Sequence, residues 1–171
     1  MTSFPPEDIS GFLQLNAGDW LTLRSLMAPE EAGGAVGGQA PETLEMGQPW
    51  HQSERGELRV TVLEADDSES CGGLAMELPG GATARLLFRT DGTVWVGEQR
   101  GRWQLAVDGS LQLDLETDGS LIQERIWFSK PNLRLRCTLE QSRDGRPGRA
   151  SFSSEIRRVS RASEAKDTRL S

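Results

Sequence analysis

Tyrosine is absent from this chain of 171 residues, and histidine occurs once, at His51. A Ser-His-Asp triad, a Cys-His pair or a histidine-rich metal site would therefore depend on that one side chain, for which we expect a surface position. The sequence also contains no CxxC, GxxxxGK or HExxH motif. These absences disfavour histidine-dependent hydrolysis and P-loop nucleotide chemistry, and we expect no metal site.

Cysteine is almost as scarce, with only Cys71 and Cys137. Two cysteines are too few for a disulfide scaffold in a chain of this length, so we expect two free thiols. Leucines flank Cys137, which predicts a buried, inert thiol, whereas Cys71 precedes two glycines and is expected to be exposed. Neither cysteine has an obvious activating group, so neither is a candidate nucleophile.

Long hydrophobic runs are missing as well, since no apolar run approaches the roughly 20 residues of a membrane span. The N-terminal segment contains Glu7 and Asp8 but no basic residue before Arg24, unlike a secretory signal. We therefore expect a cytoplasmic protein with no membrane span.

Acidic residues outnumber basic ones, but unevenly along the chain. Residues 1–120 contain 7 basic and 20 acidic residues, whereas residues 121–171 contain 12 basic and 6 acidic residues. The basic residues of the second part alternate with other residues instead of clustering, and the net charge is −7. This pattern argues against a nucleic-acid partner.

Short segments of alternating hydrophobicity, separated by turn residues, are typical of an antiparallel all-β protein. Four Asp-Gly pairs favour tight hairpins between them. Because sequential hairpins leave exposed edges unless the sheet closes, we predict a lipocalin-like up-and-down antiparallel β-barrel of about 8–10 strands. The candidate strands are residues 20–24, 58–64, 83–88, 93–96, 102–107, 111–115, 122–128, 133–139 and 150–157.

The length favours a single domain, which we place at residues 1–160. Residues 7–17 carry apolar side chains at helical spacing and predict a short N-terminal helix. Residues 29–56 are rich in glycine and proline, which indicates a mobile loop. The small and charged residues 161–171 are expected to form a frayed tail.

Strict alternation in residues 133–139, LRLRCTL, puts Arg134, Arg136 and Thr138 on one face and the leucines on the other. Alternation alone leaves two alternatives open. The leucines could fill the barrel with the arginines in solvent, or the arginines could line a cavity and bind anionic groups. The preceding strand would place Glu124 beside the arginines, as a surface ion pair or as a general acid in a barrel mouth.

Residues 124–136, ERIWFSKPNLRLR, resemble the ERxWFxxPNLRLR motif of the CpcS/CpeS (S/U-type) phycobiliprotein bilin lyases. Residues 150–157, ASFSSEIR, are similar to the ASFCSEIR ending of that family, with Ser153 where a cysteine is common. Residues 17–20, AGDW, with Arg24 four positions later, are similar to its AGxWxxxR opening. The resemblance is weak in the middle of the chain, where residues 28–52 differ, and the His-His pair that follows Arg24 in many relatives is absent.

The resemblance implies a lyase that binds a linear tetrapyrrole, such as phycocyanobilin or phycoerythrobilin, and attaches it by a thioether bond to a cysteine of a phycobiliprotein subunit, usually at the central β-subunit site. It implies that the bilin is the substrate and that no further cofactor takes part. By the family pattern, the catalytic residues would be Glu124 and Arg134. The bilin-binding residues would be Arg24, Arg134, Arg136, Thr138 and Trp20. The arginines would bind the propionates, while Glu124 would contact the pyrrole nitrogens or deliver a proton.

Other functions for the same barrel stay open. A non-enzymatic carrier would hold a bilin without accelerating its attachment, and an assembly factor would bind phycobiliprotein without pigment. A lyase could act alone, as a homodimer, or as one subunit of a heteromer with a related lyase.

Overall fold

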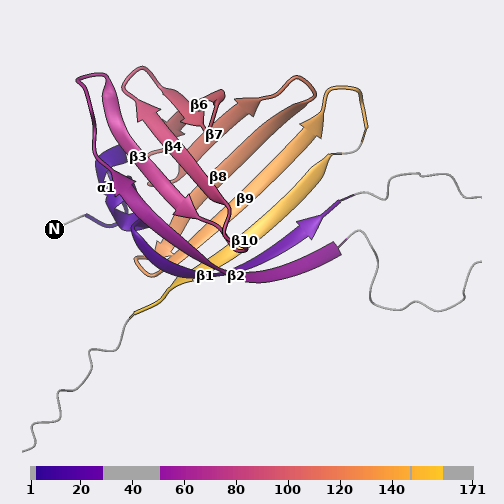
Figure 1. The fold of residues 1–171 in the computed structure, drawn as a ribbon, viewed down its shortest axis with the longest axis horizontal. Coiled ribbons are helices and arrows are strands. Elements are labelled where there is room, and N and C mark those ends of the chain that lie inside the picture. Colours follow the sequence, from indigo (N-terminus) through magenta and orange to yellow (C-terminus); the bar gives the residue numbers. More distant parts are fainter. Residues whose placement is uncertain (1–2, 29–50, 147, 160–171) are drawn as a thin grey trace, which may run out of the picture.

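The structure is a computed structural model that describes residues 3–28, 51–146 and 148–159. In these ranges the chain forms one helix and ten strands (Figure 1). The elements are α1 (Ile9–Asn16), β1 (Gly18–Met27), β2 (His51–Leu63), β3 (Ser70–Glu77), β4 (Thr83–Arg89), β5 (Thr93–Val96), β6 (Gln99–Leu105), β7 (Leu111–Glu116), β8 (Ser120–Lys130), β9 (Leu133–Ser142) and β10 (Arg149–Arg157).

The strands form a closed antiparallel barrel in which each strand pairs with the next, and β1 closes the ring by pairing with β10. Asp-Gly turns support this order. The Asp91 carboxylate accepts a hydrogen bond from the Thr93 amide at 2.8 Å, and Gly92 has a φ of 84°, a conformation that favours glycine. The predicted up-and-down barrel with a short N-terminal helix is confirmed.

Two details of the prediction were wrong. Strand β3 was not predicted, because its sequence SCGGLAME carries two glycines in place of a clear alternation. One of them, Gly73, is required, since a Cβ there would lie 2.2 Å from the Leu86 carbonyl oxygen of the neighbouring strand.

The second error concerns the expected loop at residues 29–56. Residues 51–56 belong to β2 and pair with β1. Backbone hydrogen bonds to β1, rather than buried apolar side chains, therefore order this polar stretch. Residues 29–50 and the expected tail at 161–171 lie outside the described residues.

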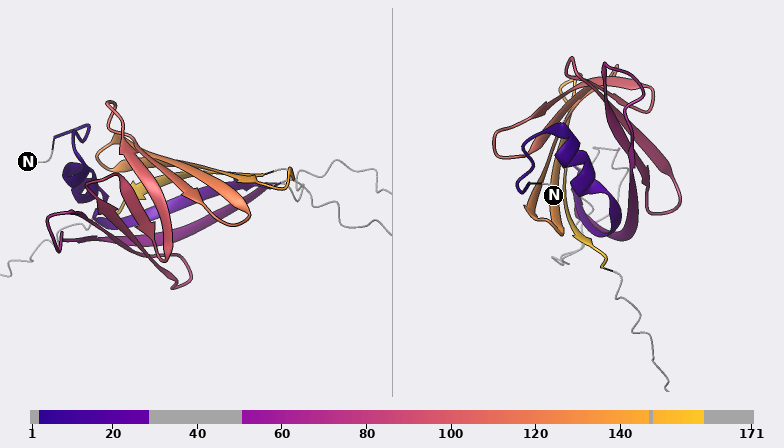
Figure 2. Two further views of the ribbon diagram at one scale, coloured as in Figure 1. Left: turned by 90° about the horizontal axis from the view of Figure 1, so that it is seen from above. Right: turned by 90° about the vertical axis from the view of Figure 1, so that its left-hand side faces the viewer.

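Helix α1 lies across one end of the barrel, as the end-on view in Figure 2 shows. Its N-terminus is capped by Asp8, whose carboxylate accepts a hydrogen bond from the Gly11 amide at 2.7 Å. Phe12 and Leu13 are buried, and the Phe12 ring packs edge-on against Phe128 with centroids 5.6 Å apart. The helix therefore closes this end, and we call it the closed end. In the described part of the chain, no helix is both long and apolar enough to span a membrane.

Candidate binding site inside the barrel

The structure decides which face of β9 points inward. The Arg134 side chain is completely buried, and Arg136 and Thr138 line the interior of the barrel. On β8, Glu124 lies on the same inner side, because its register partner on β9 is Thr138. The alternative in which the arginines form a solvated outer face is therefore excluded.

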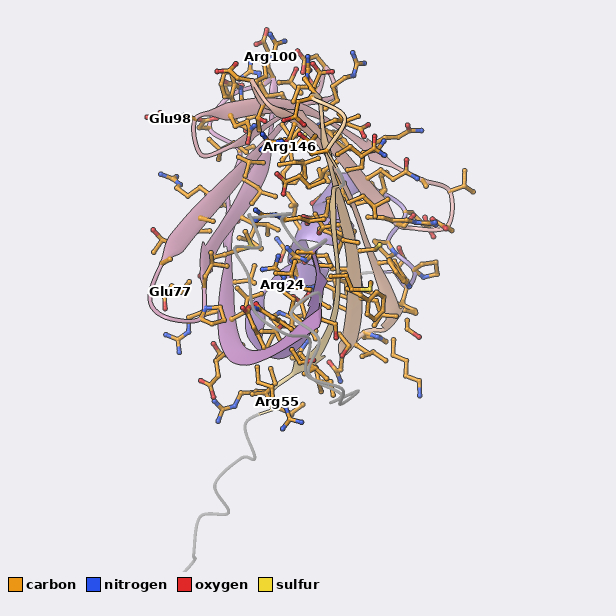
Figure 3. The ribbon with its side chains drawn as sticks, turned by 90° about the vertical axis from the view of Figure 1, so that its right-hand side faces the viewer. Arg24, Arg55, Glu77, Glu98, Arg100 and Arg146 are labelled. Carbon is orange, nitrogen blue, oxygen red and sulfur yellow. The ribbon has the colours of Figure 1, made fainter. Side chains whose placement is uncertain are left out.

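Arg24, Glu124 and Arg136 line a cavity of about 680 Å³, which we call the large cavity, and this volume is within the range typical of small-molecule sites. It is reached from the end of the barrel opposite α1, which we call the open end. Figure 3 looks into this end and shows Arg24 inside the ring of strands, with Arg100 at its outer edge. The lining of the large cavity includes Arg24, Glu54, Met76, Glu124, Arg136, Thr138, Ser151, Ser153 and Glu155.

Four charged side chains form a row across the barrel interior, which we call the ion row. Arg134 donates from Nε to the Glu155 carboxylate. The other Glu155 oxygen lies 3.8 Å from Nη2 of Arg136, whose Nη1 is 3.2 Å from Glu124. The row contains two guanidinium groups and two carboxylates, so its formal charges balance.

Burial acts differently on the two arginines of the row. Burial lowers the pKa of Arg134 to about 10, although Glu155 partly offsets this effect. Burial also acts to lower the pKa of Arg136, but the Glu124 and Glu155 carboxylates outweigh it, so that this pKa is raised. Both guanidinium groups are charged at neutral pH, and Arg136 is the one that faces the large cavity.

Arg134 is held from the closed end. Its Nη1 donates to the Asn16 side-chain oxygen at the last turn of α1, and its guanidinium carbon lies 4.7 Å from the centroid of the Trp20 ring. The Trp20 indole nitrogen in turn donates to the Asn16 carbonyl oxygen at 2.8 Å. Trp20 is fully buried and lines neither cavity described here, so the structure places it behind Arg134 as a support.

Arg24 differs from the other arginines of the site. It is exposed in the large cavity, and no described residue forms an ion pair or hydrogen bond with it. Glu54 is its register partner on β2 and lines the same cavity. Arg24 is therefore available to an anionic ligand, whereas Arg136 already has two carboxylate partners.

A second cavity of about 100 Å³ lies deeper in the barrel, and we call it the inner chamber. Three lining residues, Met76, Glu124 and Arg136, are common to both cavities. Asn16 and Arg134 border the inner chamber but not the large cavity.

The sequence analysis predicted five of the charged or polar residues that line the two cavities, but it missed Glu155, Asn16 and Ser151. The five are Arg24, Glu124, Arg134, Arg136 and Thr138. Alternation in residues 150–157 places Ser151, Ser153 and Glu155 on one face, and this signal could have identified them. Asn16 carries no comparable signal, because its partner Arg134 is 118 residues away.

Both cysteines are free and lie outside the lining of either cavity. Cys137 is partly buried on the outer face of β9, opposite Phe152. Cys71 is also partly buried instead of exposed, and burial raises its thiol pKa, with Asp91 adding to the effect. Within residues 3–28, 51–146 and 148–159, no group of three or more His, Cys, Asp or Glu side chains could hold a metal ion.

Comparison with known proteins finds relatives of this chain. The profile of a family described as CpeS-like protein matches residues 55–158. A "Chromophore lyase CpcS/CpeS 1" of Paulinella chromatophora is 36% identical over 162 residues, which are 94% of each chain. A "Chromophore lyase CpcS/CpeS" of Thermosynechococcus vestitus is 46% identical over 57 residues, 33% of this chain and 31% of the relative.

The fold has a counterpart among solved structures. The S-type phycobiliprotein lyase CPES from Guillardia theta superposes with a TM-score of 0.67 at 22% identity, covering 92% of this chain and 96% of that one. The fold similarity and the full-length sequence match lead to one conclusion: this chain belongs to the CpcS/CpeS family of chromophore lyases.

Proposed function

We propose that this enzyme binds a linear tetrapyrrole in the large cavity and attaches it through a thioether bond to a cysteine of a phycobiliprotein subunit. The observation that carries the proposal is the combination of a cavity of about 680 Å³ with charged side chains along its wall. A linear tetrapyrrole is a long conjugated ligand with two propionates, and its pyrrole nitrogens need polar partners. The cavity supplies the matching groups in a closed barrel.

Arg24 is the first candidate for a propionate, because no described residue pairs with it. Its planar guanidinium suits a carboxylate in a bidentate arrangement. Arg136 already pairs with the Glu124 and Glu155 carboxylates, so the second propionate would have to share its guanidinium group with them. The two sites therefore differ in strength, and Arg24 is expected to contribute more of the affinity for the anionic groups.

Glu124 is the candidate catalytic residue. Its side chain is 18% exposed, it lies 3.2 Å from Arg136, and Thr138 donates a hydrogen bond to it at 3.3 Å. In the proposed step, the thiolate of the acceptor cysteine forms a C–S bond with the ethylidene carbon of the terminal A ring. Glu124, which is a carboxylate in the ion row, takes the proton from the acceptor thiol and delivers it to the electron pair of the former ethylidene double bond. The balance is the addition of a thiol across a double bond.

The barrel positions the substrate and limits its exposure to water and to other thiols. The enzyme's own cysteines lie outside the cavities and take no part in the proposed step. The bilin is the substrate, and no further cofactor is needed for this addition. From the sequence we expect the reaction to take place in the cytoplasm and the central β-subunit cysteine to be the acceptor.

A bilin carrier is the second candidate, because the same cavity could hold the pigment without promoting attachment. The position of Glu124 beside Arg136, inside the cavity, favours the lyase. Action as a homodimer, or with a related lyase as second subunit, is compatible with both candidates.

The test is co-production of this protein with a bilin-synthesising system and a phycobiliprotein β-subunit. The denatured subunit is then examined by absorbance and zinc-induced fluorescence, with and without the enzyme. We expect covalent bilin at one cysteine only when the enzyme is present. Pigment that binds the enzyme but is never transferred, with either a phycocyanobilin or a phycoerythrobilin source and with a related lyase added, would favour the carrier.

A further inference from the structure

The inner chamber is larger than a water site and is lined mainly by apolar side chains. Its volume of about 100 Å³ exceeds several times the roughly 10–15 Å³ that one water needs. Its apolar lining comes from α1, β3, β4, β5, β7 and β8, and consists of Phe12, Leu74, Met76, Leu86, Val96, Leu111, Leu113, Leu115 and Ile126. A ligand group that fills it must therefore be largely apolar.

Two hydrogen-bond donors at this chamber have no partner in the described part of the chain. Arg134 uses Nε and Nη1 for Glu155 and Asn16, and its buried Nη2 is unpaired. The buried Nε of Arg136 is also unpaired. Both arginines line the chamber. Because buried donors are normally satisfied, these two atoms indicate that a hydrogen-bond acceptor belongs here.

The acceptor should be neutral. The ion row already balances its two guanidinium groups with Glu124 and Glu155, so a ligand carboxylate would add an uncompensated negative charge among apolar walls. A carbonyl oxygen on an apolar ring satisfies the donors without adding a charge. A linear tetrapyrrole carries such a group at each end, because both terminal rings are lactams.

We infer that one terminal lactam ring of the tetrapyrrole enters the inner chamber and that its carbonyl oxygen accepts hydrogen bonds from Arg134 Nη2 and Arg136 Nε. The inference rests on the proposed function, since it concerns the same ligand. It gives Arg134 a different role from propionate binding. It also fixes the direction of the substrate, because the ring that carries the ethylidene group must lie in the large cavity, which Glu124 lines and which a thiol of another protein can reach from the open end.

Infrared difference spectroscopy of the full-length enzyme tests the inference. The probes are biliverdin, which has both lactams but no ethylidene group and stays unreacted, and biliverdin dimethyl ester, which also lacks the carboxylates. In the wild-type complex we expect one lactam carbonyl band at lower frequency than in the free pigment, and the other unchanged. The same shift is expected with the ester, because the proposed bond does not involve the propionates.

A variant that fills the chamber should abolish the shift. Leu113 is buried and lines only the inner chamber, so L113F reduces the space there, whereas V94I adds a methylene to the core away from both cavities. We expect L113F to remove the shifted band and to weaken binding of the ester about tenfold, and V94I to do neither.

The outcomes separate the inference from the proposed function. If wild-type enzyme binds both pigments with two unshifted lactam bands, the inference is wrong, the chamber holds only water, and the proposed function stands. A shifted band that persists unchanged in folded L113F also overturns the inference. If the enzyme binds neither pigment, the proposed function fails and the inference fails with it.

Discussion

The two ends of the barrel use arginine in opposite ways. At the closed end, Arg134 and Arg157 lie 4.7 and 4.3 Å from the centroid of the buried Trp20 ring, and both donate to protein oxygens. At the open end, Arg24 lies in the large cavity without a partner among the described residues. The closed end therefore uses most of its arginine donors to hold the fold and leaves only Arg134 Nη2 for a neutral acceptor, whereas the open end keeps a whole cation available for an anionic group.

Arg157 holds α1 against the strands at the closed end. Its guanidinium donates to the carbonyl oxygens of Leu15 and Ala17, at the end of α1, and to the Asn132 side-chain oxygen in the β8–β9 turn at 3.1 Å. Partial burial lowers its pKa. The Arg157 side chain of β10 thus joins the helix to the β8–β9 hairpin by hydrogen bonds. The ion row lies between these hydrogen bonds and the large cavity. Substitutions toward the closed end should therefore mainly change the unfolding free energy, whereas substitutions toward the open end should mainly change the affinity for the substrate.

The largest effect is expected for E155A. This change leaves Arg134 buried without its carboxylate, and an uncompensated buried charge costs about 3–5 kcal/mol of unfolding free energy. Urea unfolding measures the loss. E57A is the matched control, because it removes a carboxylate from the exposed Arg158–Glu57 ion pair and should cost about 0–1 kcal/mol. Equal losses in the two variants would show that the ion row does not stabilise the fold.

E124Q should mainly affect the chemistry. Glutamine keeps the size and much of the hydrogen-bonding capacity of Glu124 but cannot deliver a proton, so we expect the transfer rate to fall about 100-fold. The cost in unfolding free energy should be smaller than that of E155A, because Arg136 keeps the Glu155 carboxylate as a partner. Single-turnover transfer at saturating bilin measures the chemical step. A rate equal to wild type would remove Glu124 from the mechanism.

R24Q should affect binding alone. Loss of this cation, which has no partner among the described residues, is expected to weaken bilin binding about tenfold, while the unfolding free energy stays within about 0.5 kcal/mol of wild type. Fluorescence titration and urea unfolding measure the two quantities. R100Q removes the same charge at the outer edge of the barrel, and its affinity should equal that of wild type (Figure 3). Equal weakening by both changes would mean that only overall charge matters.

The smallest effect is expected when both thiols are removed. The raised pKa of Cys71 keeps it protonated at neutral pH, and Cys137 lies on the outer face of β9. The double variant C71S/C137S should therefore transfer bilin in wild-type yield, as measured by covalent pigment on the acceptor subunit. A complete loss of transfer in the folded variant would contradict a mechanism that uses only the acceptor thiol.

The fold was predictable where local chemistry determined it. Asp-Gly turns and alternating segments predicted the hairpins, because both signals depend on neighbouring residues. Strand β3 was missed because its glycines serve close approaches to neighbouring backbone, Gly73 to β4 and Gly72 to the end of β2, and residues 51–56 were missed because their order comes from pairing with β1. Both features depend on contacts between strands, which the residue pattern within one segment does not reveal.

The site was predictable only in part. Alternation grouped Arg134, Arg136 and Thr138 but could not decide between the inside and the outside of the barrel. Whether each arginine is paired depends on residues far away in the sequence, such as Glu155 and Asn16, and no local pattern reveals which side chains pair. The sequence therefore identified the arginines. The tertiary structure distinguishes Arg134 and Arg136, which pair with carboxylates, from Arg24, which is available to a ligand.

The central claim is that the available cation of the open end binds a propionate of the substrate. The most direct test measures the affinity of wild type and R24Q for biliverdin and for its dimethyl ester. The account predicts that wild type binds the ester about tenfold more weakly than biliverdin, and that R24Q loses most of this preference, keeping only the part that Arg136 supplies. If R24Q still prefers biliverdin by the same factor as wild type, Arg24 does not bind a propionate and the claim is wrong.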